Sequence, residues 1–204
     1  MSLTPTKARQ LSHRLAVTDP AQALAVARKI KDAWFRCQAL SHVARYWPDR
    51  DYVRLLDEAV QAADAQDDDY KRVTVAAWPI RAYLERDNIP PARSLLERCT
   101  RSATHIGHMG TRSEALLMLF QAARPFATEL WMPVFWALVD AAEPSLAWRQ
   151  GRNLGLAVQM VAADHPKLVQ ATIQRLRDEK TLSAVRRDAE NRRSAQPRPF
   201  FWID

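Results

Sequence analysis

The chain has 204 residues, a formal net charge of +7 at pH 7, four glycines and two cysteines. Two cysteines are too few for a disulfide-stapled secreted domain, and charges or prolines break every apolar stretch well short of a membrane span. Alanine and leucine are abundant whereas β-branched residues are scarce, and straight-chain residues lose the least entropy in a helix. The composition therefore predicts an all-α fold.

The positive charge is concentrated at the two ends of the chain. Residues 1–50 carry a net charge of +6 and residues 151–204 carry +4, whereas residues 51–99 carry −3. A protein that follows a phosphate backbone along its whole length needs a continuous basic surface. The distribution argues against that mode of nucleic-acid binding and leaves local binding open.

Proline and short polar residues mark the expected helix starts in the N-terminal half. Thr4-Pro5 predicts a short first helix with Thr4 as its N-cap, and Asp19-Pro20 repeats this signal at the start of a helical hairpin. The acidic run 67–69 is interpreted as the cap of a later helix rather than as a cation site. Two hairpins are expected in this half, at residues 19–47 and 50–86.

The C-terminal half contains the same kind of punctuation. Thr111 followed by Glu114 predicts a capping box at the start of a helix. Three further hairpins are expected at residues 89–124, 128–163 and 165–193. One helical domain should therefore occupy residues 1–193, followed by an apolar C-terminal tail at residues 194–204.

Four arginines recur at intervals of 36, 40 and 40 residues, and a period of this length is typical of stacked helical hairpins. We call Arg36, Arg72, Arg112 and Arg152 the marker arginines. Asp32 and Asp68 stand one helical turn before the first two, which predicts an ion pair in each of these repeats. The last two lack such a partner and are candidates for gripping an external ligand. Arg45 and Arg81 stand nine residues after the first two markers.

With this repeat the chain resembles the superfamily of tetratricopeptide-like and HEAT-like helical-hairpin repeats, from about residue 19 to about residue 190. The resemblance lies in the marker arginines with the pairs Ala39-Leu40, Ala115-Leu116 and Gly155-Leu156 that follow three of them. It is a resemblance of architecture, since the Trp-x-x-Leu-Gly-x-x-Tyr signature of a tetratricopeptide unit is absent. It implies a right-handed α-α superhelix, or solenoid, of about five hairpins whose faces bind peptides, proteins or occasionally nucleic acid.

The sequence shows no catalytic apparatus: no Ser/His/Asp arrangement, glycine-rich phosphate loop or zinc motif is found. His105 and His108, with Cys99 and Met109 nearby, lie in a glycine-containing connector and are interpreted as a solvated loop. No metal, cofactor or catalytic residue is therefore predicted, and Cys37 and Cys99 are expected to be reduced thiols in the core. Trp136 and Asp140 share a helix face. This pair resembles the Trp and Asp side chains that HEAT-like DNA glycosylases use in a concave cleft.

The chain has seven tryptophans, and all except Trp202 are expected mainly in the core. The tail contains the apolar run Phe200-Phe201-Trp202-Ile203. Burying each large side chain contributes roughly 1.5–3 kcal/mol, so the run should dock on the chain's last hairpin or into another molecule. A homo-oligomer formed through the tail is one form of the second arrangement.

Repeat architecture without catalytic chemistry predicts a non-catalytic protein- or peptide-binding scaffold. The N-terminal sequence lacks the pattern of a secretory signal, so a cytoplasmic protein without membrane contact is expected. The alternative is a nucleic-acid-binding or base-processing HEAT-like solenoid. The candidate binding residues are Arg112, Arg149, Arg152, Phe200, Phe201 and Trp202.

Overall fold

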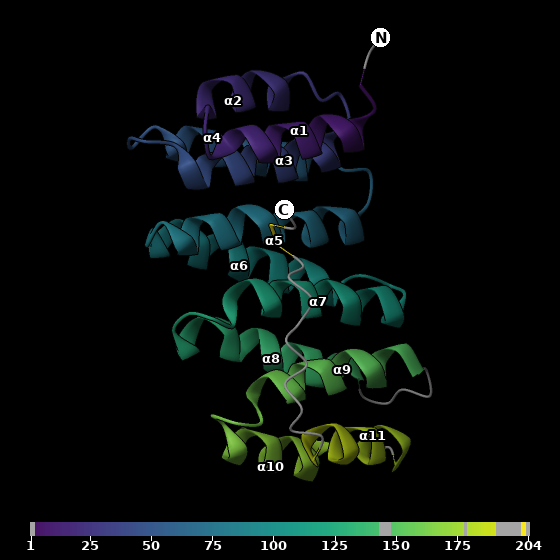
Figure 1. The fold of residues 1–204 in the computed structure, drawn as a ribbon. Helices are drawn as coiled ribbons and strands as arrows, with labels where there is room; N and C mark the ends of the chain where they lie inside the picture. Colours follow the sequence, from purple (N-terminus) through teal and green to yellow (C-terminus); the bar gives the residue numbers. More distant parts are fainter. Residues whose placement is uncertain (1–2, 143–147, 178, 191–200, 203–204) are drawn as a thin grey trace. The chain divides into compact units, whose positions relative to one another are not determined.

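The computed structural model describes residues 3–142, 148–177, 179–190 and 201–202, and all regular structure in these ranges is α-helical (Figure 1). The predicted all-α class is confirmed. None of the helices described combines the length and hydrophobicity needed to cross a membrane. The helices are α1 (Pro5–Ala16), α2 (Pro20–Arg28), α3 (Ala33–Tyr46), α4 (Tyr52–Asp64), α5 (Asp69–Glu85), α6 (Ile89–Thr104), α7 (Met109–Ala123), α8 (Thr128–Ala142), α9 (Trp148–Val161), α10 (Pro166–Arg175) and α11 (Glu179–Glu190).

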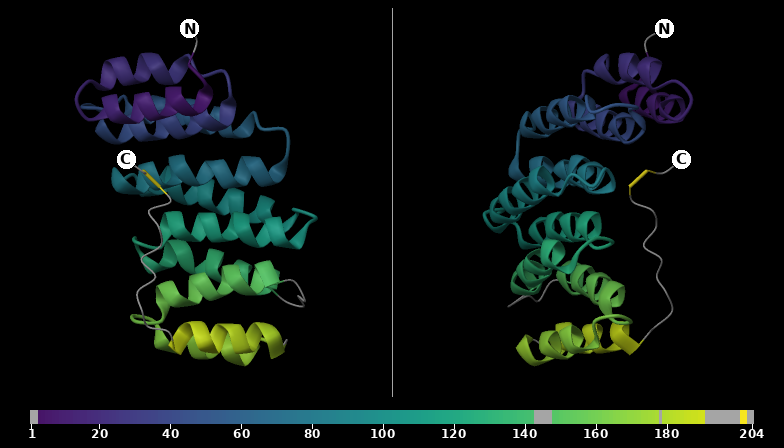
Figure 2. Two further views of the ribbon diagram at one scale, coloured as in Figure 1. Left: turned by 45° about the vertical axis from the view of Figure 1, so that its right-hand side comes forward. Right: turned by 90° about the vertical axis from the view of Figure 1, so that its left-hand side faces the viewer.

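The chain forms two compact units. The first runs to Cys99 and also contains Phe201 and Trp202, and the second begins at Thr100. In the first unit α3 packs against α1 and α5, while α2 and α4 pack beside them. In the second unit α9 packs against α7 and α11, with α8 and α10 as further neighbours (Figure 2). Packing between helices that are close in the chain is compatible with a helical repeat.

Polar N-caps start the helices at several of the expected positions. Thr4 and Asp19 each accept a hydrogen bond from the third following backbone N–H, and proline occupies the first helical position after each cap. Asp68 caps α5 by accepting from the Lys71 backbone N–H at 2.7 Å, which confirms the acidic run as a cap. α5 continues through Pro79, which therefore does not mark a helix boundary.

The predicted capping box at Thr111 is wrong. α7 begins at Met109, and the ring Nδ1 of His108 accepts the Thr111 backbone N–H at 3.3 Å. Thr111 thus lies inside the first turn, and its hydroxyl donates to the His108 carbonyl at 2.9 Å. The histidine takes the cap position because a neutral imidazole nitrogen accepts a hydrogen bond as an aspartate oxygen would.

Ion pairs join helices that lie one hairpin apart in the chain. Their side chains are about half exposed in most cases, and such pairs contribute at most about 1 kcal/mol each. The stability of both units therefore comes mainly from buried apolar side chains, among them Leu40 and Leu56 in the first and Phe120 and Trp131 in the second. Three such pairs are Arg28–Glu58, Arg98–Asp64 and Arg175–Asp140, and the less exposed pair Arg45–Glu85 joins α3 and α5 in the same way.

Candidate functional site

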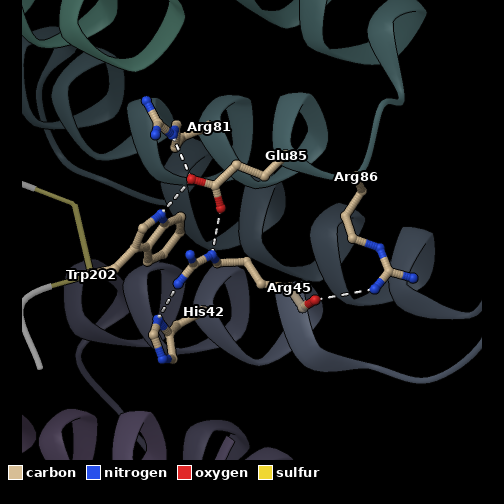
Figure 3. A network of polar contacts seen from close by, with 6 residues as sticks. All are labelled: His42, Arg45, Arg81, Glu85, Arg86 and Trp202. Carbon is tan, nitrogen blue, oxygen red and sulfur yellow. Dashed lines mark hydrogen bonds and ion pairs between the residues drawn. The ribbon is translucent and has the colours of Figure 1, made fainter. Parts of the chain in front are cut away.

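The aromatic pair Phe201-Trp202 lies against α3 and α5 in the first unit. Figure 3 shows Trp202 beside Arg45 and Glu85. Phe201 is buried, and its ring meets Trp78 of α5 edge-on with 5.1 Å between the ring centroids. The half-buried Trp202 donates from Nε1 to Glu85 Oε1 at 3.0 Å, and the Arg45 guanidinium lies over its ring, 4.3 Å from the centroid. Ring contacts, a hydrogen bond and a cation–π contact therefore hold the pair.

The expectation that the tail docks on its own last hairpin is wrong. The last hairpin is α10 and α11, whereas Phe201 and Trp202 contact α3 and α5. The physical reason is that α5 supplies both an aromatic partner, Trp78, and a carboxylate acceptor, Glu85. Phe200 lies outside the described residues.

Glu85, the last residue of α5, is the centre of a charged network (Figure 3). Its Oε2 accepts from Arg45 Nε at 2.5 Å, and its Oε1 accepts from Arg81 Nε at 2.6 Å as well as from Trp202. About one fifth of each of the three charged side chains is exposed. Charge-assisted hydrogen bonds are stronger than neutral ones, and partial burial limits their screening by solvent. Arg45 and Arg81, which occupy equivalent repeat positions in the sequence, thus converge on one carboxylate.

Arg45 is fixed at its backbone as well as at its side chain. Arg86 Nη1 donates to the Arg45 carbonyl at 3.1 Å (Figure 3). The Arg86 guanidinium also lies 4.3 Å from the ring centroid of Tyr52. These contacts tie the end of α5 to the end of α3. The guanidinium that covers Trp202 is therefore positioned by contacts that do not involve the tail.

Two buried histidines lie next to this network. His42 of α3 stacks on His13 of α1 with 4.1 Å between ring centroids, and its Nδ1 lies 3.4 Å from Arg45 Nη1. A guanidinium has no acceptor, so His42 Nδ1 accepts this hydrogen bond and its ring is neutral. Burial, together with the charge of Arg45, lowers the pKa of His42 to about 4. The neutral ring can therefore lie against Arg45 and 5.3 Å from the Trp202 ring without charge repulsion.

Two of the marker arginines, Arg36 and Arg112, donate hydrogen bonds to backbone carbonyls of their own chain. Arg36 Nη1 donates to the Ile30 carbonyl at 3.2 Å, and Arg112 Nε donates to the Ile106 carbonyl at 2.8 Å, in both cases six residues back. Each arginine thus closes the turn that precedes its own helix. The ion pair predicted between Asp32 and Arg36 is wrong, because the Asp32 carboxylate caps α3 instead.

Arg72 differs from Arg36 and Arg112 in its partner. Its Nη1 lies 3.3 Å from Asp69 Oδ1, whereas Asp68, the expected partner, caps α5. Asp32 and Asp68 accept hydrogen bonds from the backbone because an N-cap carboxylate lies beside the free N–H groups of the first helical turn.

Replacing Arg112 by alanine is expected to lower the free energy of unfolding of the second unit by about 1–2 kcal/mol, because the Ile106 carbonyl loses a charged donor. Arg101→Ala, at an exposed position in the same unit, is the matched control and should change it by about 0.5 kcal/mol or less. Urea denaturation followed by circular dichroism measures both. Equal effects would show that the contact with Ile106 carries no stability.

The other two predicted arginines lie together at the start of α9. Arg149 and Arg152 are exposed, and the Arg152 guanidinium lies 5.0 Å from the ring centroid of Trp148. Trp148 is 70% exposed, so its expected place in the core is wrong. Arg112 instead has its Nε bound to a carbonyl of its own chain, and a ligand for any of these arginines stays a prediction.

The pair Trp136 and Asp140, singled out from the sequence, is bound to α10. Arg175 forms an ion pair with Asp140, and its guanidinium lies 5.4 Å from the Trp136 ring centroid. Trp136 also borders an open hollow of about 680 Å³, which Met132 and Leu168 help to line. Asp140 is paired with Arg175 and is therefore not an isolated carboxylate that could act on a nucleobase.

The histidine and cysteine side chains offer no obvious reactive group. His108 caps α7, and His105 Nδ1 lies 2.9 Å from the Arg101 carbonyl. Across the part of the chain that the structure describes, no three His, Cys, Asp or Glu residues are grouped to hold a metal ion. Cys37 and Cys99 are buried, as predicted, and burial raises the pKa of the Cys99 thiol to about 12. Both cysteines are therefore protonated thiols near neutral pH.

No motif or cap signal in the sequence singles out Glu85, Trp78 or His42. Only the equivalent positions of Arg45 and Arg81 in the repeat pointed toward this part of the chain. No family model, no curated protein and no solved structure matches this chain, so its function is inferred from its own residues.

Proposed function

We propose that this chain is a non-catalytic scaffold that binds protein or peptide segments, built as a right-handed solenoid of the tetratricopeptide-like and HEAT-like kind. The observation that carries the proposal is the binding of Phe201-Trp202 to side chains of α3 and α5. An aromatic segment from a distant part of the sequence is held here by Arg45, and the repeat equivalent of Arg45, Arg81, holds the acceptor Glu85. Repeat proteins bind extended segments in this way, with side chains from successive repeats.

The chemistry of the site supports binding rather than catalysis. Glu85 is occupied by two guanidinium groups, and His42 has a pKa far below neutrality, so neither is suited to transfer protons near pH 7. Arg45 and Trp78 offer a cationic face and an aromatic edge. Such groups recognise aromatic side chains.

Affinity capture with the full chain, followed by reconstitution with each purified captured protein, tests this function. We expect a protein that binds saturably and whose affinity falls less than about tenfold between 50 and 200 mM salt, because the contacts at the site are largely aromatic. A chain carrying Arg28→Ala, a change in an exposed ion pair, is the control and should bind equally well.

A second candidate function is nucleic-acid binding by the second unit. The observation in its favour is Trp148, which is exposed and flanked by the exposed Arg149 and Arg152. Exposed aromatic rings between arginines can stack on nucleobases. If the chain retained no protein but bound single-stranded nucleic acid, with affinity falling roughly a hundredfold or more over the same salt range, this candidate would replace the scaffold.

A further inference from the structure

The receptor for Phe201-Trp202 is organised by contacts that the tail does not make. Glu85 is held by Arg45 and Arg81 at 2.5 and 2.6 Å, and the Arg45 carbonyl accepts from Arg86. The neutral His42 lies beside Arg45 on the other side. A site that is positioned before its ligand arrives loses little entropy on binding. These side chains therefore form a preorganised seat for an aromatic segment.

The seat discriminates between aromatic side chains. The indole of Trp202 combines two contacts: it donates a hydrogen bond to Glu85 Oε1 at 3.0 Å and presents a large π-face to the Arg45 guanidinium at 4.3 Å. A phenylalanine at this position would leave the Glu85 oxygen without this donor. The neighbouring Trp78 edge requires only an apolar aromatic ring, here that of Phe201. The seat therefore fits an aromatic residue followed by tryptophan.

The charge of the seat adds a further requirement. Around the Trp202 indole, the guanidinium groups of Arg45 and Arg81 lie against the single carboxylate of Glu85 (Figure 3). His42 adds no charge near neutral pH. A ligand with an acidic residue close to its tryptophan complements this excess of positive charge. The tail sequence itself meets this condition, since Asp204 follows Trp202 by two residues.

The tail is bound with a strained backbone. Trp202 has a φ of 61°, in the left-handed region, which costs an ordinary residue roughly 1–2 kcal/mol. A segment that reaches the same contacts without this strain would bind more tightly by about tenfold. The tail is therefore a suboptimal occupant of the seat.

We propose that the seat on α3 and α5 is a receptor for an acidic segment of another protein that carries an aromatic residue followed by tryptophan. The chain's own Phe201-Trp202 occupies this receptor as a competing ligand and lowers its affinity for the partner. This inference rests on the proposed function and assigns its site, its ligand chemistry and its regulation.

The test uses a fluorescently labelled peptide with the sequence of residues 196–204 and the full chain. The chain with Trp202→Ala is expected to bind this peptide about tenfold more tightly than the wild-type chain, because the competing indole is gone. Adding Glu85→Gln to the Trp202→Ala chain should weaken binding about tenfold, since a charged acceptor is lost. Fluorescence anisotropy measures the affinities, and circular dichroism verifies that the variants keep their helix content.

Peptide variants test the ligand chemistry. A peptide with Trp202→Phe should bind at least about tenfold more weakly, and one with Asp204→Lys about fivefold more weakly, than the parent peptide. Equal binding of the parent peptide by the wild-type and Trp202→Ala chains, or no binding to either, would overturn the proposal. A dimeric wild-type chain that becomes monomeric on Trp202→Ala would also overturn it, in favour of tail exchange between copies.

The outcome separates this inference from the proposed function. If the peptide fails to bind while a captured protein still binds the full chain, the scaffold function stands and its site lies elsewhere. If the peptide binds but no protein is captured, the seat is a receptor for the tail alone.

Discussion

Replacing Trp131 by alanine is expected to lower the free energy of unfolding of the second unit by roughly 3–5 kcal/mol. Trp131 is fully buried and packs edge-on against Phe120, with 5.7 Å between ring centroids, and against His165, at 5.0 Å. The Arg124 guanidinium also lies 4.8 Å from its ring. Removing the indole leaves a cavity among aromatic rings that cannot collapse without losing these contacts. Urea denaturation followed by circular dichroism measures the change.

Two further variants separate burial from residue type. Trp131→Phe should cost no more than about 1.5 kcal/mol, because the Trp131 indole N–H donates no hydrogen bond among the described residues and only volume is lost. Trp148→Ala, at an exposed tryptophan of the same unit, should cost about 0.5 kcal/mol or less. Comparable losses for Trp131→Ala and Trp148→Ala would contradict the assignment of the aromatic core.

The first unit is expected to lose about 3 kcal/mol of unfolding free energy between pH 7 and pH 4 through His42. The pKa of His42 is about 4 in the folded chain and 6.5 for an ordinary histidine. The unfolded chain therefore takes up a proton as the pH falls below 6.5, whereas the folded chain does not until about pH 4. The stability is fully present above pH 6.5 and is lost as the pH falls toward 4.

Burial, together with the groups around His42, decides the sign of this effect. Arg45 opposes its protonation at 3.4 Å, and His13 stacks on its other face. Glu85, the nearest carboxylate of the network, is engaged by Arg45 itself. His42→Gln keeps a polar side chain of similar size and cannot titrate, so the variant should lack this part of the pH dependence. Urea denaturation at several pH values compares the two chains, and parallel pH profiles would exclude His42 as the cause.

Local signals allowed several helix starts to be predicted, because a cap acts within one turn. Thr4, Asp19 and Asp68 stand where the sequence placed them. The same locality explains the error at Thr111. Both His108 and Thr111 can serve as a cap, and only the position of the helix on its neighbours decides between two candidates three residues apart.

The candidate site depends on contacts that are remote in sequence and could not be predicted from periodicity. Trp202 and Glu85 are 117 residues apart, and nothing in the tail specifies α5 as its destination. Hydrophobicity predicted only that Phe201 and Trp202 would be covered. Exposed Trp148 shows the converse error, since residue type alone does not tell which tryptophan of a helix faces solvent.

The turn before each of the first three marker helices is fixed in length. Four residues precede α3, α5 and α7 alike, whereas the helices between the markers lengthen from 14 and 13 residues in α3 and α4 to 17 and 16 in α5 and α6. The contacts from Arg36 to Ile30 and from Arg112 to Ile106 span this turn, so an insertion or deletion there would break them. Related sequences should therefore place their alignment gaps in the helices or in the connectors that follow the marker helices, and not in the turns before α3 and α7.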